Sequence, residues 1–484
     1  MNTTHSPMEA ATIPRVLVGL VASWAVAVVV GMASHLMGAM LGVIIGSVVL
    51  AWGWRSSTGP WLAERQLLFN PAAWGIALLA FSPFMPARIG PSVAGLSIDD
   101  APLLVGSALL ALGVMRVEGL SALRQPLALP LGLFALWNGV AVFLSDSVTV
   151  ASLLRGVGRW GLFAVAFALL IVVARRGRDW VTLMVGAMFL FGLLQALFGL
   201  WSYAVDWILL DPNVARNIGM ERFRWYQVLF DVVPGRITGT LGVSSNFYGA
   251  LMLFPLLLSA AFLVRAKVWS EWIAYGAVMA LTWFALVFSY TRASMAAAVI
   301  GFVFLIFLSR GYRLAGVAVV LVVAAVVFTP ALDRFDEGND RFNLAFNAFD
   351  VIGDNPLGGL GPGEFSEELG EDGGRAIATP HNSYLLAAAE TGLIGGGLLF
   401  LATVLPAAHV AIAAFRRRPV ELTLGALVAV MAAYGAQTLS NNLFHIPTVA
   451  IYFWMAAAAG IGLVAVDRST HDEETRSATL EEAA

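Results

Sequence analysis

The sequence predicts an all-α, polytopic membrane protein with about 12–14 transmembrane helices. Of its 484 residues, 59% are hydrophobic and only 12% are charged, whereas a soluble domain carries about 25% charged residues. Runs of roughly 18 or more apolar residues recur along nearly the whole chain, and each is long enough to cross a ~30 Å hydrocarbon core as a helix. The absence of cysteine excludes a disulfide framework, a thiolate metal site and a cysteine nucleophile.

The expected spans follow the apolar runs along the chain. We place them at residues 16–33, 37–54, 72–86, 101–115, 127–145, 157–174, 180–205, 243–264, 272–290, 293–309, 314–329, 383–414, 420–438 and 447–466. The first run has no small-residue cleavage site and a second run follows almost at once, so we interpret it as a retained span and not as a removed signal peptide. The third and fourth runs are short, which also suits tilted or re-entrant helices.

The positions of the cations predict the orientation of the chain. Alternate connections between the spans, together with the two terminal segments, carry most of the Lys and Arg residues, so the positive-inside rule makes these connections and both termini cytoplasmic. The two longest loops, 206–242 and 330–382, then face outward. The cations of the outer face are all arginines: Arg88, Arg155, Arg159, Arg216, Arg222, Arg224, Arg236, Arg292, Arg334, Arg341 and Arg375. Solvated loop charge explains any single one of them, but the planar guanidinium fork also suits phosphate and pyrophosphate.

The spans and loops divide the chain into six segments. We expect N-terminal transmembrane helices, an outward loop, further transmembrane helices, a large outward loop with an amphipathic helix, C-terminal transmembrane helices and a disordered cytoplasmic tail. Their respective residues are 1–205, 206–242, 243–329, 330–382, 383–466 and 467–484. The tail is rich in Asp and Glu, a composition typical of disorder.

Two polar stretches border the middle group of spans. The first, residues 236–246, runs from Arg236 to Asn246 and forms a Gly/Thr/Ser-rich entry into a helix. Free amide groups at a helix start beside an Arg bind anions, although helix capping alone explains the Ser, Thr and Asn residues. The second, residues 288–294, links two spans tightly and places Arg292 at membrane depth. An Arg is unfavourable there unless it snorkels, pairs with a partner or lines a wet cavity.

The second outward loop combines an amphipathic pattern with a glycine-rich run. Apolar residues recur at spacings of three and four over residues 340–352, namely Phe342, Ala345, Phe346 and Phe349. This spacing predicts a short amphipathic helix on the membrane surface. The Gly/Pro run at residues 357–363 predicts a sharply turning loop. We interpret that loop as a structural turn and not as a phosphate cradle, because its spacing matches no nucleotide-binding loop.

His381 lies at the junction between the second outward loop and a long apolar run that contains Glu390, Gly392 and Gly395. Glu390 falls about 13 Å further along the helix at ~1.5 Å per residue, which is too deep for a direct hydrogen bond to His381. We interpret Glu390 as the partner of a buried donor and the two glycines as positions of close helix packing. Taken alone, a histidine at a helix start is more typical of an interfacial cap than of a catalytic group.

Taken together and in this order, the four stretches resemble the O-antigen ligase and O-antigen polymerase superfamily of envelope glycan transferases. The hallmark of the family is a His followed by Asn or Ser, with Gly-x-x-Gly about ten residues on. Here these are His381-Asn382 and Gly392-Leu393-Ile394-Gly395. The accompanying family elements resemble residues 236–246, 289–293 and 355–365, the last with Gly358, Gly361 and Gly363. The resemblance covers roughly residues 236–395.

The resemblance implies a GT-C-like, metal-independent and inverting glycosyltransferase without a cofactor, in the bacterial inner membrane, with its active site facing the periplasm. The donor would be a glycan on undecaprenyl pyrophosphate. The acceptor would be a sugar hydroxyl, on lipid A-core for a ligase or on another lipid-linked glycan for a polymerase. Membrane lipids would surround the chain and no nucleic acid would bind. A chain-length regulator would accompany a polymerase, and a protein-directed oligosaccharide transferase is a further subtype that the resemblance leaves open.

The resemblance also implies roles for individual residues. His381 would accept a proton from the attacking hydroxyl or orient it, and an imidazole with an ordinary pKa of about 6.5 suits that task. Arg236 and Arg292 would bind the pyrophosphate. The further candidates for donor or acceptor binding are Arg216, Arg222, Arg224, Arg341, Asn246, Asn382 and Tyr384, and those for structural support are Glu390, Gly392, Gly395, Gly361 and Gly363. We assign no metal ligand, because no outward His/Asp/Glu cluster has metal-ligand spacing.

Two other classes of protein compete with this interpretation. A transporter or flippase would suit the number of spans, but such proteins place ionisable residues at mid-membrane and often contain inverted repeats. The predicted spans are almost free of charge apart from Glu390, and we find no repeat. A structural assembly platform would leave His381 and the outward arginines unexplained.

Overall fold

The structure is a computed structural model, and it describes residues 70–84, 100–145, 149–209, 237, 245–309, 338–365, 379–416 and 420–483. The expected spans at 16–33, 37–54 and 314–329 lie outside these residues. Every other expected span is a helix, and the described residues contain no strand. Eight of the described helices are long and apolar enough to cross a membrane. The prediction of an all-α polytopic membrane protein is therefore confirmed.

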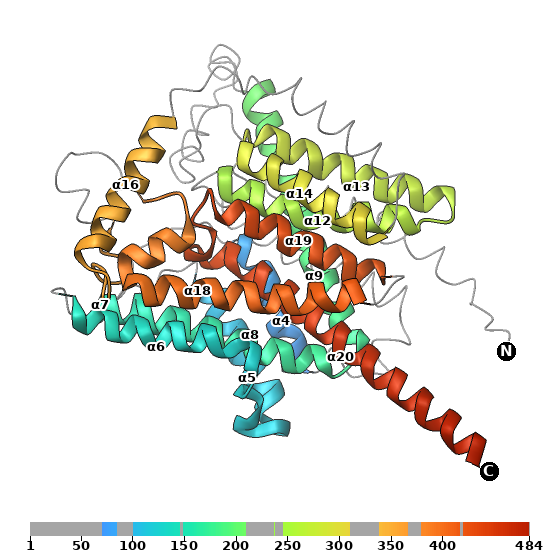
Figure 1. Cartoon of the computed structure of the whole chain (residues 1–484). Helices are drawn as coiled ribbons and strands as arrows, with labels where there is room; N and C mark the ends of the chain where they lie inside the picture. The colour runs from blue at the N-terminus through green and yellow to red at the C-terminus, as the bar shows by residue number, and fades with distance from the viewer. Residues whose placement is uncertain are drawn as a thin grey trace.

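The helices keep to the hydropathy pattern within a few residues. In chain order they are α4 (Pro71–Phe81), η2 (Ser82–Phe84), α5 (Ala101–Glu118), η4 (Gly119–Leu123), η5 (Pro126–Ala128), α6 (Leu129–Leu144), α7 (Val150–Leu153), η6 (Leu154–Gly158), α8 (Arg159–Arg175), α9 (Arg178–Leu209), α12 (Ser245–Arg265), α13 (Trp269–Phe288), α14 (Arg292–Ser309), α16 (Gly338–Asp354), α18 (Ser383–Arg416), α19 (Leu422–Thr438), η10 (Leu443–His445) and α20 (Pro447–Ala483). The long helices lie side by side as a bundle, while α16 crosses its end (Figure 1).

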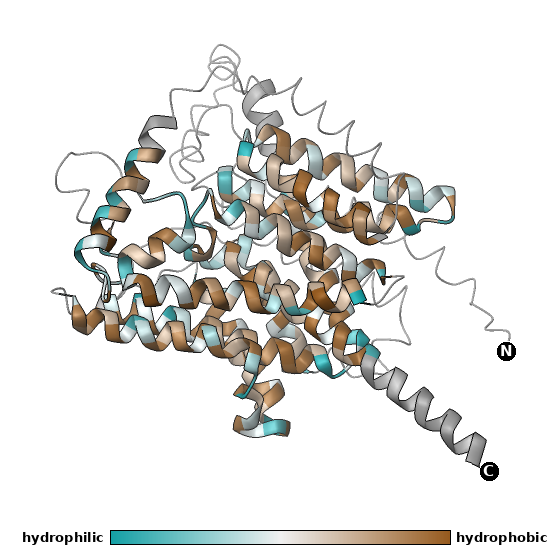
Figure 2. Ribbon diagram, in the orientation of Figure 1, coloured by the Kyte–Doolittle hydropathy of each residue, from teal (hydrophilic) through white to brown (hydrophobic). Residues whose placement is uncertain are grey.

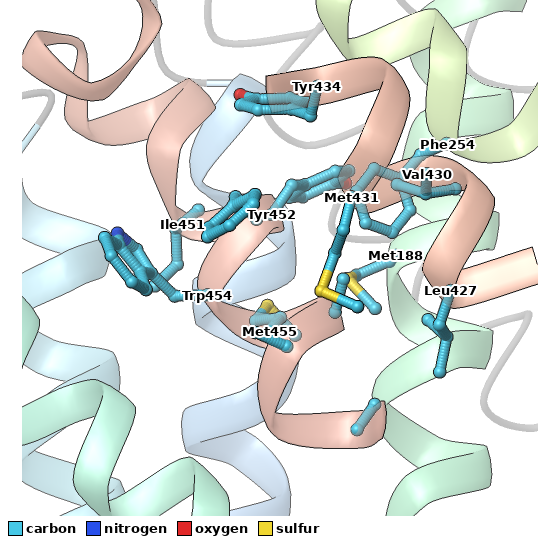
Figure 3. Close-up of a cluster of buried hydrophobic side chains, with 14 of the residues drawn as sticks. Met188, Phe254, Leu427, Val430, Met431, Tyr434, Ile451, Tyr452, Trp454 and Met455 are labelled. Carbon is cyan, nitrogen blue, oxygen red and sulfur yellow. The ribbon is translucent and has the colours of Figure 1, made fainter. Parts of the chain in front are cut away.

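The centre of the bundle is formed by α12 and α20, which are almost wholly buried by their neighbours. Figure 3 shows large apolar side chains meeting there from different helices, among them Phe254 of α12, Tyr434 of α19, and Tyr452 and Trp454 of α20. The more peripheral α5 and α6 expose apolar rows instead, and Figure 2 shows the hydrophobic colour running along the bundle helices. An apolar outer surface is what a bilayer requires of a spanning helix.

The C-terminal tail differs from the sequence prediction. We predicted disorder after residue 467, but α20 continues as a helix to Ala483. The tail residues include good helix formers. A helix already nucleated by the buried span also needs no new nucleus to continue.

Candidate functional site

His381 is half-buried on a bend directly before α18. The helix start is capped by the next residue, because Asn382 Oδ1 accepts hydrogen bonds from the backbone N–H groups of Tyr384 at 2.9 Å and Leu385 at 3.1 Å. The capping role that the sequence left open for His381 therefore belongs to Asn382. With the cap supplied by its neighbour, the His381 imidazole is not needed to complete the helix.

Tyr384 points into the bundle. Its hydroxyl lies 2.9 Å from the hydroxyl of Thr403, and its ring packs against Phe400 and Phe444 with centroid distances of 5.5 and 6.4 Å. We predicted a role for Tyr384 in donor or acceptor binding. The structure gives its hydroxyl a partner within the protein, so its visible contribution is to hold the start of α18 against the core.

The start of α18 is also held by the segment that follows α19. Ser383 Oγ donates to the backbone carbonyl of Asn441 at 3.3 Å and accepts from the N–H of Phe444 at 3.2 Å. Asn442 Nδ2 donates to Thr379 Oγ1 at 3.1 Å, on the other side of His381. The sequence analysis missed this segment. The signal that marks it is the polar run at residues 440–442 between two apolar spans.

The stretches at 236–246 and 288–294 meet as the sequence order suggested. Thr291 Oγ1 donates to the carbonyl of Ser245 at 3.0 Å, and the N–H of Ile237 donates to the carbonyl of Phe288 at 3.1 Å. Arg292 begins α14 with its side chain exposed. This exposure leaves the guanidinium accessible at a helix end.

Gln437 at the end of α19 connects these stretches to the His381 side of the bundle. Its Nε2 donates to the carbonyl of Asn246 at 3.0 Å and to Ser294 Oγ at 2.6 Å. The same α19 chain end continues into the segment that holds Ser383. The end of α19 thus fixes the starts of α12, α14 and α18 relative to one another. We call the region that contains these polar contacts the His381 end of the bundle.

Several predicted site residues fall outside the structural description. Arg216, Arg222, Arg224 and Arg236 lie outside the described residues, and for Arg341 only the backbone within α16 is described. Of the two arginines predicted to bind pyrophosphate, the structure therefore describes Arg292 and not Arg236. Within the described ranges, no three His, Asp or Glu side chains are close enough to hold a metal ion.

α18 is broken near its start. Thr391 has φ −133° and ψ 15°, and Gly392 has φ 72° and ψ 176°, so the helix ends after Glu390 and begins again after Gly392. We call Thr391–Gly392 the helix break. A break within a membrane span frees backbone polar groups that lipid cannot satisfy. The indole Nε1 of Trp137 in α6 donates to one of them, the carbonyl of Thr391, at 2.8 Å.

The glycine-rich loop, residues 355–365, satisfies the other freed groups. The N–H of Leu360 donates to Ala389 O at 3.0 Å, and the N–H of Gly361 donates to Glu390 O at 2.9 Å. In the opposite sense, the N–H of Leu393 donates to the carbonyl of Pro356 at 2.9 Å. The loop therefore binds both sides of the helix break, which agrees with the interpretation of the Gly/Pro run as a structural turn.

Glycine is required on both sides of this contact. A Cβ on Gly392 would lie 2.0 Å from the carbonyl oxygen of Leu357, and a Cβ on Gly359 would lie 2.4 Å from the backbone of Glu390. Gly361 and Gly363 in the same loop also have positive φ, at 111° and 85°. We predicted close helix packing at Gly392, and the close approach there is to the glycine-rich loop. Gly395, one turn on, faces Thr391 and Trp137.

Glu390 is buried beside the glycine-rich loop at 9% exposure. Its carboxylate accepts a hydrogen bond from the backbone N–H of Gly363, and the charges of the Arg155 and Arg159 guanidinium groups act on it. Arg155 Nη2 in turn lies 3.7 Å from Glu364 Oε1, to which Ser152 Oγ donates at 3.1 Å. The sequence-based interpretation of Glu390 as the partner of a buried donor matches the Gly363 hydrogen bond.

Arg155 belongs to a π-helical turn, η6, which leads into α8. Such turns occur frequently at functional sites. Arg159, one turn later, donates from Nη2 to Asp100 Oδ2 at 3.1 Å, and that carboxylate is buried. The sequence placed both arginines on the outer face without giving them a role. In the structure they belong to a charged network with Asp100, Glu364 and Glu390.

His445 closes the His381 end of the bundle next to this network. Its ring contacts Trp160 edge-on with centroids 5.7 Å apart, and its Nδ1 has no hydrogen-bond partner among the described residues. Burial, and after it the charge of Arg159, lowers the pKa of His445 to about 3. The imidazole of His445 therefore stays neutral in mildly acidic solution, where an ordinary surface histidine becomes protonated.

The chain is similar to a known protein family over part of its length. Residues 277–401 match a family model described as O-antigen ligase. The matched segment contains Arg292, the glycine-rich loop, His381 and the helix break. No curated protein matches the chain.

Proposed function

We propose that this chain, whose residues 277–401 belong to the O-antigen ligase superfamily, transfers a glycan from undecaprenyl pyrophosphate to an acceptor sugar hydroxyl. The observation that carries the proposal is His381, which lies within the matched segment at the head of a membrane helix that Asn382 already caps. We place the reaction at the periplasmic face of the inner membrane, since the sequence assigns the His381 end of the bundle to the outer side.

In the proposed reaction the acceptor oxygen attacks the anomeric carbon of the donor. The bond between that carbon and the pyrophosphate oxygen breaks, and the anomeric configuration is inverted by the single displacement. The acceptor proton passes to the imidazole of His381, which requires His381 to be neutral beforehand. The leaving pyrophosphate gains negative charge, and Arg292 together with Arg236 would stabilise that charge through fixed guanidinium groups.

Replacing His381 tests the assignment directly. For His381→Ala in proteoliposomes with a lipid-linked donor, we expect transfer to fall by about 10²–10⁴-fold, the usual contribution of a general base. His471→Ala, a histidine substitution in the C-terminal part of α20, is the matched control and should keep the wild-type rate. Wild-type transfer by a well-expressed His381→Ala protein would exclude His381 as the base.

The products in a deletion strain distinguish the two main subtypes. Accumulated single lipid-linked repeats would show that the chain is a polymerase, because repeats would no longer be joined. Accumulated long lipid-linked polymer would show that it is a ligase, because finished glycan would no longer reach its final acceptor. Mass analysis of the extracted lipid-linked glycans reads out both cases.

A further inference from the structure

Helix α16 (Gly338–Asp354) presents three different faces. One face packs on the protein: Ala348 and Ile352 are buried against Leu386 and Ala389 of α18. A second face is aromatic and uncovered, with Phe342, Phe346 and Phe349 at 67%, 63% and 59% exposure.

The third face of α16 is polar. Asn343, Asn347 and Asp350 are exposed, and each directly follows one of the three phenylalanines in the chain. One residue corresponds to a rotation of about 100° around an α-helix, so the polar face lies beside the aromatic face and not opposite it. A helix with protein, apolar and polar sides in this order has the form of one lying at a boundary between lipid and water.

The position of α16 agrees with such a boundary. It lies across the end of α18, against which it packs, instead of running along that helix (Figure 1). α6 exposes an apolar row toward this end, with Leu136 at 65%, Phe143 at 69% and Leu144 at 56% exposure. The loop after α16 reaches the same place, because a Cβ on Gly358 would lie 2.8 Å from the Leu144 side chain. The loop that leaves α16 thus meets the exposed apolar row of α6, a helix long and apolar enough to cross a membrane.

We propose that the Phe342–Phe346–Phe349 face lies in the boundary region of the bilayer leaflet on the His381 side, in contact with lipid. The neighbouring packed face of α16, with Ala348 and Ile352, holds the short helix between His381 and the helix break. Lipid contact at the three phenylalanines therefore fixes the height of His381 relative to that leaflet, where a lipid-linked substrate would present its head group. The lipid contact itself does not depend on the proposed function.

The chain contains no cysteine, so a single introduced cysteine can be spin-labelled without further changes. We would label Phe346→Cys and, as the matched control one residue away, Asn347→Cys, in the full-length protein in phosphatidylglycerol/phosphatidylethanolamine nanodiscs. Collision with oxygen reports lipid exposure, and collision with a neutral nickel chelate reports water exposure. We expect the oxygen-to-nickel ratio to be several-fold higher at position 346 than at position 347.

Equal nickel accessibility at the two positions would overturn the proposal, because the aromatic face would then lie in water. Dipolar broadening between labels at position 346 would also overturn it, since a second copy of the chain would then cover the face. Phe349→Cys and Asp350→Cys form a second matched pair. If the first pair does not fold, the oxygen-to-nickel ratio is compared between positions 349 and 350 in the same way.

Discussion

Gly392 offers the sharpest test of how the helix break supports the site. Its φ of 72° and ψ of 176° lie in a region that is essentially restricted to glycine and costs another residue about 1–3 kcal/mol. A methyl group there would also meet the Leu357 carbonyl oxygen at 2.0 Å and its carbon at 2.4 Å. Both are backbone atoms, so no side-chain rotation relieves the overlap, and the glycine-rich loop must move away from α18.

Movement of that loop removes hydrogen bonds across the break. The bond from Leu393 N–H to Pro356 O is the nearest one, and each such bond contributes about 0.5–1.5 kcal/mol. With the backbone term, we expect Gly392→Ala to lower the free energy of unfolding by about 2–4 kcal/mol. The Tm shift per kcal/mol shrinks with chain length and is about 1–2 °C for a chain of this size, so the Tm in detergent should fall by roughly 2–8 °C.

Gly397→Ala in the same helix is the matched control. A Cβ at Gly397 meets nothing within 4 Å, so we expect no loss of stability or of transfer activity there. Transfer by Gly392→Ala, measured well below its Tm, should fall at least about tenfold, corresponding to ~1.4 kcal/mol in the barrier, because the helix next to His381 is displaced. Equal Tm values and equal activities for the two alanine variants would refute the reasoning.

Three further predictions address single side chains. Arg292→Ala should lower kcat/KM for the donor by about 10–100-fold, with Arg292→Lys only partly restoring it because the planar fork is lost; full activity of the Lys variant would mean that Arg292 merely snorkels. Glu390→Gln should keep the hydrogen bond from the Gly363 N–H and lose less thermal stability than Glu390→Ala, which leaves that donor unsatisfied; equal Tm values would contradict this. Because the pKa of His445 is lowered, the unfolded chain binds a proton at this histidine below about pH 6.5, whereas the folded chain binds it only near pH 3. The free energy of unfolding should therefore fall as the pH drops, by about 2 kcal/mol at pH 5. His445→Phe should flatten the dependence of Tm on pH between 7.5 and 5, and an unchanged slope would exclude His445 as its source.

The membrane helices were predictable because the signal is local. A span needs only a sufficient apolar length, and that length is visible in the sequence. The start of α18 at Ser383 was predictable for the same reason, since Asn382 is a good cap in front of an apolar run.

The helix break and the His381 end of the bundle were not predictable, because both depend on contacts between distant segments. Thr391 and Gly392 lie in an apolar run whose pattern predicts a continuous helix. The break is stabilised by hydrogen bonds from the glycine-rich loop and from Trp137, which come from distant parts of the sequence. Gln437 and the segment at 440–442 lack any catalytic motif. Their importance lies in reaching Asn246, Ser294 and Ser383, which a linear pattern does not reveal.

The break changes what determines the position of His381. In an unbroken helix, His381 would follow the tilt and depth of the whole span from Ser383 to Arg416. Because the helix is interrupted at Thr391–Gly392, the short piece from Ser383 to Glu390 is held by its neighbours instead: α16, the glycine-rich loop, and the segment after α19. The buried Glu390 carboxylate secures the inner end of that piece through Gly363, while Ser383 secures its outer end. The same α19 chain end also fixes the start of α14 through Gln437 and Ser294. It follows that the polar contacts at one end of the bundle help to set the separation of His381 and Arg292, the two residues we assign to proton transfer and pyrophosphate binding.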